Sequence, residues 1–175
     1  MTIRTLSLTL ALIFVSPQVL AHGKEKHDTA TFTPGRDTAK AMLHVAPEAN
    51  DAIATVERFA AALSAGDVPR AGAELDPGVL ILESGGVERS RDEYLAGHAK
   101  SDAAFMKGAH VSLKHRTARA AGDLAWVASE SDIHASKDGK RLMISSTETV
   151  VLKRSAQGWK IVHIHWSSRR ANAAH

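Results

Sequence analysis

Residues 158–169 read GWKIVHIHWSSR, and this stretch decides the fold prediction. Side chains alternate across a β-strand, so one face is expected to carry two histidines among large apolar groups and the other only large apolar groups. The first face comprises Trp159, Ile161, His163 and His165, and the second comprises Val162, Ile164 and Trp166. Both faces must be covered, which predicts a central strand of a curved sheet that lines a partly polar cavity.

The chain begins with the pattern of a secretory signal peptide. Arg4 is the only early charge, Leu6 to Val15 is mostly apolar, and small residues surround Ala21. The apolar run is shorter than the roughly 20 residues that span a bilayer. We therefore expect residues 1–21 to be removed near Ala21, leaving a periplasmic or secreted protein with no membrane span in the mature chain.

The composition excludes several classes of protein. None of the 175 residues is cysteine, so disulfides, thiolate metal sites and cysteine nucleophiles are absent. The formal net charge is +3, and the densest basic patch, residues 114–119, would divide between two strand faces. Aromatic residues make up only 5% of the chain, whereas nucleic-acid binding favours clustered cations with interleaved aromatics. No nucleic-acid partner is expected.

Residues 22–49 are polar and interrupted by Pro34-Gly35 and Pro47, which predicts a flexible linker or arm ahead of a domain at 50–171. His22 and His27 lie in this arm. A newly exposed amino-terminal histidine with a second imidazole nearby could chelate copper or nickel. The two histidines are therefore weak candidates for metal ligands, and solvated tail residues are the alternative.

The spacing of apolar residues predicts helices first and strands later. Helical periodicity and capping residues predict three helices, at 50–65, 67–76 and 90–106. A period of two, with turn residues between, predicts strands at 79–83, 110–120, 124–135, 141–154 and 159–168. Short turns between consecutive strands give a mainly antiparallel sheet, so the fold class is α+β, with three N-terminal helices on one face of a strongly curved sheet.

The order of elements and the closing strand resemble the nuclear transport factor 2-like superfamily. The resemblance covers roughly residues 50–170 and is nearest to the SnoaL-like and calcium/calmodulin-dependent kinase association-domain branches, which end in a similar strand. It implies a cone-shaped half-barrel that encloses a pocket, usually in a homodimer or a larger assembly. It does not fix the function, because the superfamily includes isomerases, dehydratases, binding proteins and assembly domains.

The predicted third helix carries the sharpest functional signal. Its apolar face contains Tyr94, His98 and Asp102, and the last two are four residues apart, so their side chains are expected to touch. A carboxylate that accepts a hydrogen bond from an imidazole orients the other ring nitrogen, as in a general base or a metal ligand. His98 and Asp102 are therefore the candidate catalytic residues. The alternative is a satisfied pair that only holds the helix to the sheet.

Three more residues complete the predicted ligand-binding set. His163 and His165 share a strand face about 7 Å apart and could converge on one ligand. Glu83 ends the first predicted strand before Gly85-Gly86, where its carboxylate could overhang the pocket mouth. Glu130 is a second choice for an acidic group. The predicted pocket lies between the third helix, with Tyr94, and the last strand.

The leading hypothesis is an exported domain that binds a small-molecule ligand. The first alternative is an acid/base enzyme of isomerase, dehydratase or hydrolase type that uses His98 and Asp102. The second is a periplasmic metal-binding protein, motivated by ten histidines, and the third is an oligomeric assembly module with Trp166 as an interface anchor. No cofactor is evident from the sequence, and a divalent metal ion is left open.

Overall fold

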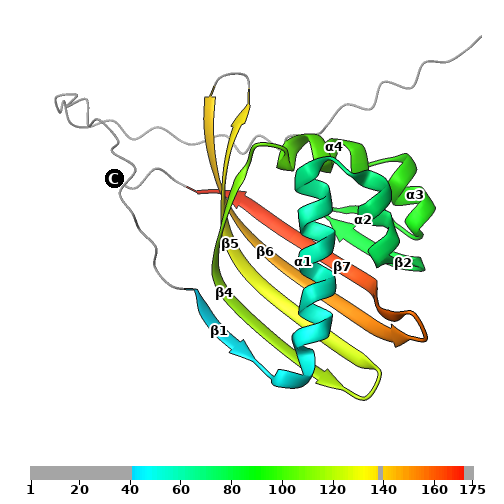
Figure 1. Ribbon diagram of the computed structural model, residues 1–175. Helices are drawn as coiled ribbons and strands as arrows, with labels where there is room; N and C mark the ends of the chain where they lie inside the picture. Colours follow the sequence, from blue (N-terminus) through cyan, green and yellow to red (C-terminus); the bar gives the residue numbers. More distant parts are fainter. Residues whose placement is uncertain (1–40, 138–139, 172–175) are drawn as a thin grey trace, which may run out of the picture. The chain divides into compact units, whose positions relative to one another are not determined.

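The computed structural model describes residues 41–137 and 140–171. Twelve elements follow one another in this part of the chain (Figure 1). They are β1 (Met42–Val45), the 3₁₀ helix η1 (Pro47–Ala49), α1 (Asn50–Ala65), α2 (Val68–Glu74), β2 (Leu75–Glu83), β3 (Gly86–Glu88), α3 (Arg91–Ala96), α4 (Ala99–Met106), β4 (His110–Ala121), β5 (Leu124–Lys137), β6 (Lys140–Ser155) and β7 (Gly158–Arg170).

The strands form one open sheet in the order β1-β4-β5-β6-β7-β2-β3. Strands β4 to β7 are antiparallel neighbours, while β1 pairs with β4 and β2 with β7 in parallel. The sheet is strongly curved and the helices lie on its concave face, with α1 crossing the long strands (Figure 1). The predicted α+β class with a mainly antiparallel curved sheet is confirmed.

The predicted third helix is interrupted. Ser90 Oγ accepts a hydrogen bond from the Glu93 amide at 3.1 Å, so the helix starts where its capping residues predict. At Gly97 the backbone leaves the helical region (φ −105°, ψ −105°), and α4 begins after His98. One predicted helix is therefore two helices, α3 and α4, and side chains on either side of Gly97 do not follow a common helix face.

Strand β7 does not alternate regularly, because Val162 forms a β-bulge. Ile161 pairs with Leu152 while His163 pairs with Val151, so Val162 is the extra residue. The bulge moves the following side chains to the opposite face from the one that simple alternation predicts. Ile161 and Ile164 are both fully buried under the helices. His163 and His165 lie on the convex face instead, so the predicted face assignment was wrong.

The folded domain begins before residue 50. Met42–Val45, which was predicted to belong to a flexible arm, forms β1 and pairs with Arg116 and its neighbours on β4. Ala49, at the end of η1, is fully buried in the core. The predicted signal peptide and the part of the arm up to residue 40 lie outside the described residues.

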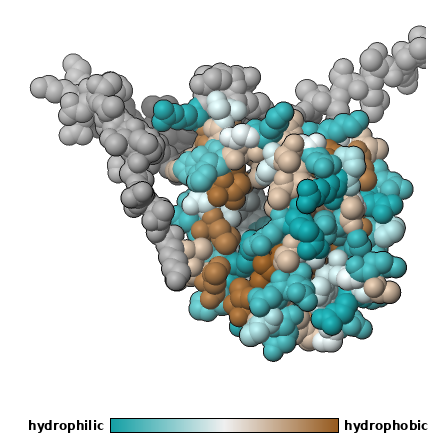
Figure 2. Space-filling view, viewed as in Figure 1, coloured by the Kyte–Doolittle hydropathy of each residue, from teal (hydrophilic) through white to brown (hydrophobic). Residues whose placement is uncertain are grey.

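The core fills the space between the concave face and the helices. Its largest fully buried side chains come from both layers and include Tyr94, Leu75, Ile81, Leu152, Ile161 and Ile164. On the face that Figure 2 presents, apolar surface gathers beside α1 among mostly polar side chains. Within residues 41–137 and 140–171, no helix combines the length and the hydropathy needed to cross a bilayer.

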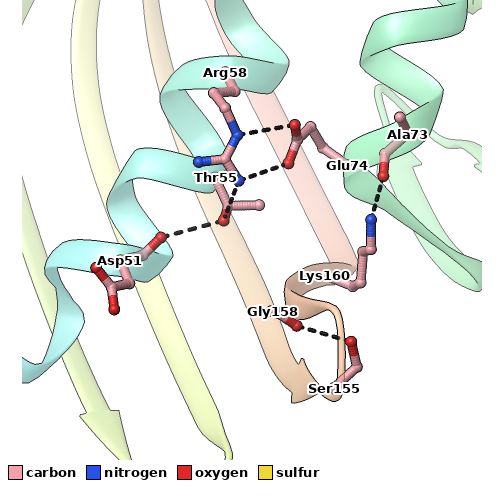
Figure 3. Close-up of polar contacts among 8 residues, drawn as sticks. All are labelled: Asp51, Thr55, Arg58, Ala73, Glu74, Ser155, Gly158 and Lys160. Atoms are coloured by element: carbon pink, nitrogen blue, oxygen red, sulfur yellow. Dashed lines mark hydrogen bonds and ion pairs between the residues drawn. The ribbon is translucent and has the colours of Figure 1, made fainter.

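A bidentate ion pair joins α1 to α2. The Arg58 guanidinium donates to both carboxylate oxygens of Glu74 at 2.9 Å, and its Nη2 also donates to Thr55 Oγ1 at 3.0 Å (Figure 3). Thr55 is buried and its hydroxyl donates to the Asp51 carbonyl at 3.2 Å. Bidentate, charge-assisted pairs fix the relative position of two elements more firmly than single surface ion pairs. Arg58 therefore holds α2 against α1.

Replacing Arg58 by Met should lower the free energy of unfolding by about 1–2 kcal/mol, because Glu74 loses both charged donors while the aliphatic stem is kept. Urea denaturation measures this difference. Arg70→Met on the exposed side of α2 is the matched control and should change stability by less than about 0.5 kcal/mol. Equal effects of the two substitutions would show that the ion pair contributes nothing.

Candidate ligand-binding cavity

A cavity of about 340 Å³ lies between α1, α4 and the concave face of the sheet. Its apolar lining is Val56, Ala60, Ala61, Phe105, Met106, Val111, Ile133, Ile144 and Trp166. Its charged lining is Glu57, Glu83, Asp102, Arg116 and Glu148. Its hydroxyl lining is Ser64, Ser129, Ser131, Ser146 and Ser168. The size falls at the small end of the range of about 300–1,000 Å³ typical of ligand sites, and the mixture of apolar walls with a few polar groups is typical as well.

Asp102 faces this cavity from α4 and is held by Tyr94. The buried Tyr94 hydroxyl donates a hydrogen bond to Asp102 Oδ2 at 2.9 Å. Burial raises the pKa of Asp102, while the bond from Tyr94 and the charge of His98 act against that rise. Burial and the Asp102 charge raise the pKa of Tyr94, so the phenol keeps its proton and remains a donor. The arrangement is an oriented carboxylate in an apolar wall.

Glu83 lines the same end of the cavity from the end of β2. Burial raises its pKa, and the nearby charge of Asp102 raises it further. Two carboxyl groups that interact in this way do not both ionise freely, so the pair is expected to hold one proton to a higher pH than either group alone. The sequence predicts that Glu83 lies near the rim of the pocket, and the structure places it in the cavity lining.

His98 occupies the break between α3 and α4, and its partner is Glu88 rather than Asp102. Its Nδ1 contacts Glu88 Oε1, and the Glu88 side chain is buried while the imidazole is half exposed. The hydrogen bond to Glu88 raises the pKa of His98. The expected side-chain pair does not form, although the Asp102 amide donates to the His98 carbonyl at 2.9 Å, one helical turn away. The imidazole contacts Glu88 instead, and the Asp102 carboxylate accepts from Tyr94. His98 reaches Asp102 and Glu83 only through its charge.

His163 and His165 are not brought to the cavity. Because of the bulge at Val162, they lie on the convex face, where His163 Nδ1 contacts the Leu80 carbonyl at 2.9 Å. Trp166 lies on the strand face opposite the histidines, as predicted, but this strand face is the concave one that lines the cavity. Its ring stacks on Phe59 with centroids 6.3 Å apart, so it is not available as an exposed interface anchor.

The predicted ligand-binding set does not include the polar group on the sheet side of the cavity. Trp166 Nε1 donates to Glu148 Oε2 at 2.7 Å, and burial raises the pKa of Glu148. On β4, Arg116 donates to Ser129 Oγ at 3.2 Å and to Glu57 Oε1 at 2.8 Å. The available signal was Glu148 itself, a carboxylate that shares a strand face with Ile144 and Val150.

Glu130, the second-choice acid, faces away from the cavity and pairs with His115 at 3.3 Å on the convex side. In the part of the chain that the structure describes, no three His, Asp or Glu side chains are arranged to hold a metal ion. His22 and His27, the weak candidates for metal ligands, lie outside that part, so their role stays a prediction.

Comparison with known proteins identifies the family. The model of the SnoaL-like domain matches residues 53–170. The chain belongs to the SnoaL-like domain family. The predicted resemblance to the nuclear transport factor 2-like superfamily is confirmed by this match and by the solved structures that this SnoaL-like domain resembles. No curated protein matches the chain.

A provisionally assigned ketosteroid isomerase from Shewanella frigidimarina is 34% identical over 73% of this chain and all of its own, with a TM-score of 0.64. A provisionally assigned calcium/calmodulin-dependent protein kinase II association domain from Xanthomonas campestris is 22% identical over 71% of this chain and 89% of its own (TM-score 0.61). A provisionally assigned dehydratase of the NTF2-like family from Streptomyces avermitilis is 20% identical, covering 72% of this chain and 97% of its own (TM-score 0.60). The last two similarities establish the fold alone.

Proposed function

We propose that this SnoaL-like domain binds a small, mainly apolar organic molecule in the cavity between α1, α4 and the sheet. The carrying observation is the juxtaposition of apolar walls with Asp102, Glu83 and Glu148, whose carboxyl groups line the same cavity. A carboxyl group in an apolar wall is costly unless it has a partner. Such groups are more common at ligand sites than in ordinary cores.

A thermal-shift screen of small organic molecules tests the proposal if it includes a variant with a filled cavity. Ala61 lines the cavity from α1, so Ala61→Trp would occupy part of the space. Ala65→Trp, at the exposed end of the same helix, is the control. Binding molecules should raise the Tm of the wild type and of Ala65→Trp but not of Ala61→Trp. Equal shifts in all three proteins would place binding elsewhere.

The second candidate function is proton transfer on the bound molecule, with Asp102 as general base. An ionised carboxylate that is oriented by Tyr94 and carries a raised pKa suits removal of a proton next to a carbonyl group. The relative from Shewanella frigidimarina carries a provisional assignment to ketosteroid isomerisation. Isomerisation of a β,γ-unsaturated 3-ketosteroid, followed through the absorbance of the conjugated product, is therefore the first reaction to assay.

Export of the protein is part of the proposal. It is supported by the single early charge at Arg4, the apolar run that follows and the small residues around Ala21. Mass spectrometry of the protein recovered from a periplasmic extract should give a chain that begins near His22. Recovery of the uncut chain from the cytoplasm would overturn the proposal.

We also propose that the convex face joins two copies of the chain. Trp126 is 40% exposed on this face, and Leu80 and Leu124 are exposed there as well. An apolar group of this kind on a sheet face suits an interface between subunits. The similarity to an association domain is a likeness of fold.

Replacing Trp126 by Glu should shift the protein from dimer to monomer in size-exclusion chromatography with light scattering, because a charge would be buried at the centre of the interface. Trp126→Phe keeps the apolar contact and should remain dimeric. A wild-type protein that is monomeric at 100 μM, or a dimeric Trp126→Glu variant, would contradict the proposal.

A further inference from the structure

The polar lining of the cavity consists of carboxyl groups, one guanidinium, and serine hydroxyls that can both donate and accept hydrogen bonds. Asp102 Oδ2 accepts from Tyr94 and Glu148 Oε2 from Trp166, but among the described residues no donor reaches the other oxygen of either group. The Glu83 carboxylate accepts no hydrogen bond from a described residue. An ionised carboxylate can accept hydrogen bonds but cannot donate them. Three carboxyl groups therefore face the cavity with unused acceptor positions.

The one cation in the described lining does not balance these charges. Arg116 donates from Nε to Ser129 and from Nη1 to Glu57. Glu57 therefore takes up much of the positive charge of Arg116, although Arg116 still acts on Glu148. The end of the cavity near Asp102 and Glu83 contains no cationic lining residue. Burial raises the pKa of both carboxyl groups and the charge of His98 lowers it in part, but His98 is paired with the buried Glu88. The cavity as a whole is matched to positive charge.

The remaining walls suit an apolar body with an aromatic or alkyl character. Phe105 and Met106 contribute from α4, and Val111, Ile133 and Ile144 contribute from the sheet. Phe105 and Trp166 also present aromatic rings to the cavity, and aromatic faces attract cations. Apolar walls, aromatic rings and unused acceptors are thus combined in one partly open cavity.

We propose that the molecule bound in this cavity carries a protonated amine on an apolar body, with the ammonium group between Asp102 and Glu83. This inference rests on the proposed binding function and narrows it to a class of ligand. An ammonium group has three donors and no acceptor, so it complements the unused oxygens, whereas a ligand carboxylate would face like charge. A neutral alcohol supplies one donor and no charge.

The carboxyl groups give the binding a defined pH dependence. Burial raises the pKa values of Asp102 and Glu83, and a bound ammonium favours their ionised forms. Amine binding should therefore be strongest above these raised pKa values. It should weaken as the pH falls through them, because each carboxyl group must lose a proton to bind the cation.

Isothermal titration calorimetry with matched probes tests the inference. The first series has a phenylbutyl body and consists of 4-phenylbutylamine, 4-phenylbutan-1-ol and 4-phenylbutyrate. The second has a naphthyl body and consists of 2-(1-naphthyl)ethylamine, 2-(1-naphthyl)ethanol and 3-(1-naphthyl)propionate. For both bodies the amine should bind at least ten-fold more tightly than the alcohol, and the carboxylate most weakly. Alcohol binding as tight as amine binding, or a preference for the carboxylate, would overturn the inference while leaving the binding function intact.

Two nearly isosteric variants locate the ammonium group. Asp102→Asn and Glu83→Gln should each reduce the affinity for the amine at least five-fold and leave the affinity for the alcohol within two-fold. Glu130→Gln removes one carboxylate from the convex face and should change neither affinity. An equal loss in Glu130→Gln would attribute the preference to the overall charge and overturn the assignment.

The experiments distinguish failure of the proposed binding function from failure of the ligand class alone. If none of the probes binds at 2 mM and no molecule in the thermal-shift screen depends on the cavity, both the binding function and the ligand class are wrong. If molecules from the screen bind in the cavity but lack a basic nitrogen, only the ligand class is wrong.

Discussion

Replacing Ile164 by Ala is expected to lower the free energy of unfolding by about 2–5 kcal/mol. Ile164 is fully buried between β6 and the helices, and removing its side chain beyond Cβ leaves a cavity that the core cannot fully close. The size of the effect follows from the β-bulge at Val162, which turns Ile164 towards the helices. Chemical denaturation followed by circular dichroism gives the difference directly.

The neighbouring substitution His165→Ala is the matched control for this register. His165 is exposed on the convex face, so its removal should change the free energy of unfolding by less than about 0.5 kcal/mol. Both variants should be measured under the same conditions and compared with the wild type. A large effect of His165→Ala with a small effect of Ile164→Ala would mean that the bulge is absent and the strand faces are exchanged.

Replacing Asp102 by Asn should abolish most turnover if the domain transfers protons. An amide of nearly the same shape keeps the contact with Tyr94 but cannot accept the proton, so the expected loss in kcat is about 10²–10⁴-fold. The assay is the isomerisation of the β,γ-unsaturated ketosteroid, with Glu130→Gln as a control on the convex face. Unchanged turnover in Asp102→Asn would exclude this residue as the base.

The same substitution should affect stability in the opposite direction. Because burial raises the pKa of Asp102 above its ordinary value of 3.8, the folded protein holds this proton more tightly than the unfolded chain. Stability contributed by the protonated form is present below about pH 3.8 and is lost as the pH rises through the raised pKa. At neutral pH the wild type therefore keeps a costly buried charge, and Asp102→Asn should unfold at a higher temperature.

The layered fold could be predicted because local signals agree with it. The turns at Gly122 and Gly158 adopt the positive φ values, 59° and 102°, that favour glycine, so the limits of the long strands followed from the sequence. The bulge at Val162 could not be predicted from alternation, because both possible faces of β7 offered large apolar groups. Only the pairing with β6, which is set by the whole sheet, decides which of Ile164 and His165 is buried.

The part of the candidate site that depends on local sequence signals could be predicted, and the part that depends on tertiary pairing could not. Glu83 and Asp102 lie in the cavity lining, and Tyr94 holds Asp102 from α3 through a hydrogen bond. The partner of His98 was not predictable, because Glu88 lies on β3 and only the tertiary fold brings it to the imidazole. The sequence does not identify Glu148 and Arg116 as cavity residues, because their place in the cavity depends on which face of the sheet is concave.

A crystal structure of the protein with the tightest-binding molecule from the screen would show where the ligand lies. We predict electron density for the ligand between α1, α4 and the concave face, with a polar atom within hydrogen-bond distance of Asp102. A ligand bound on the convex face beside His163 and His165, with the cavity empty, would contradict it.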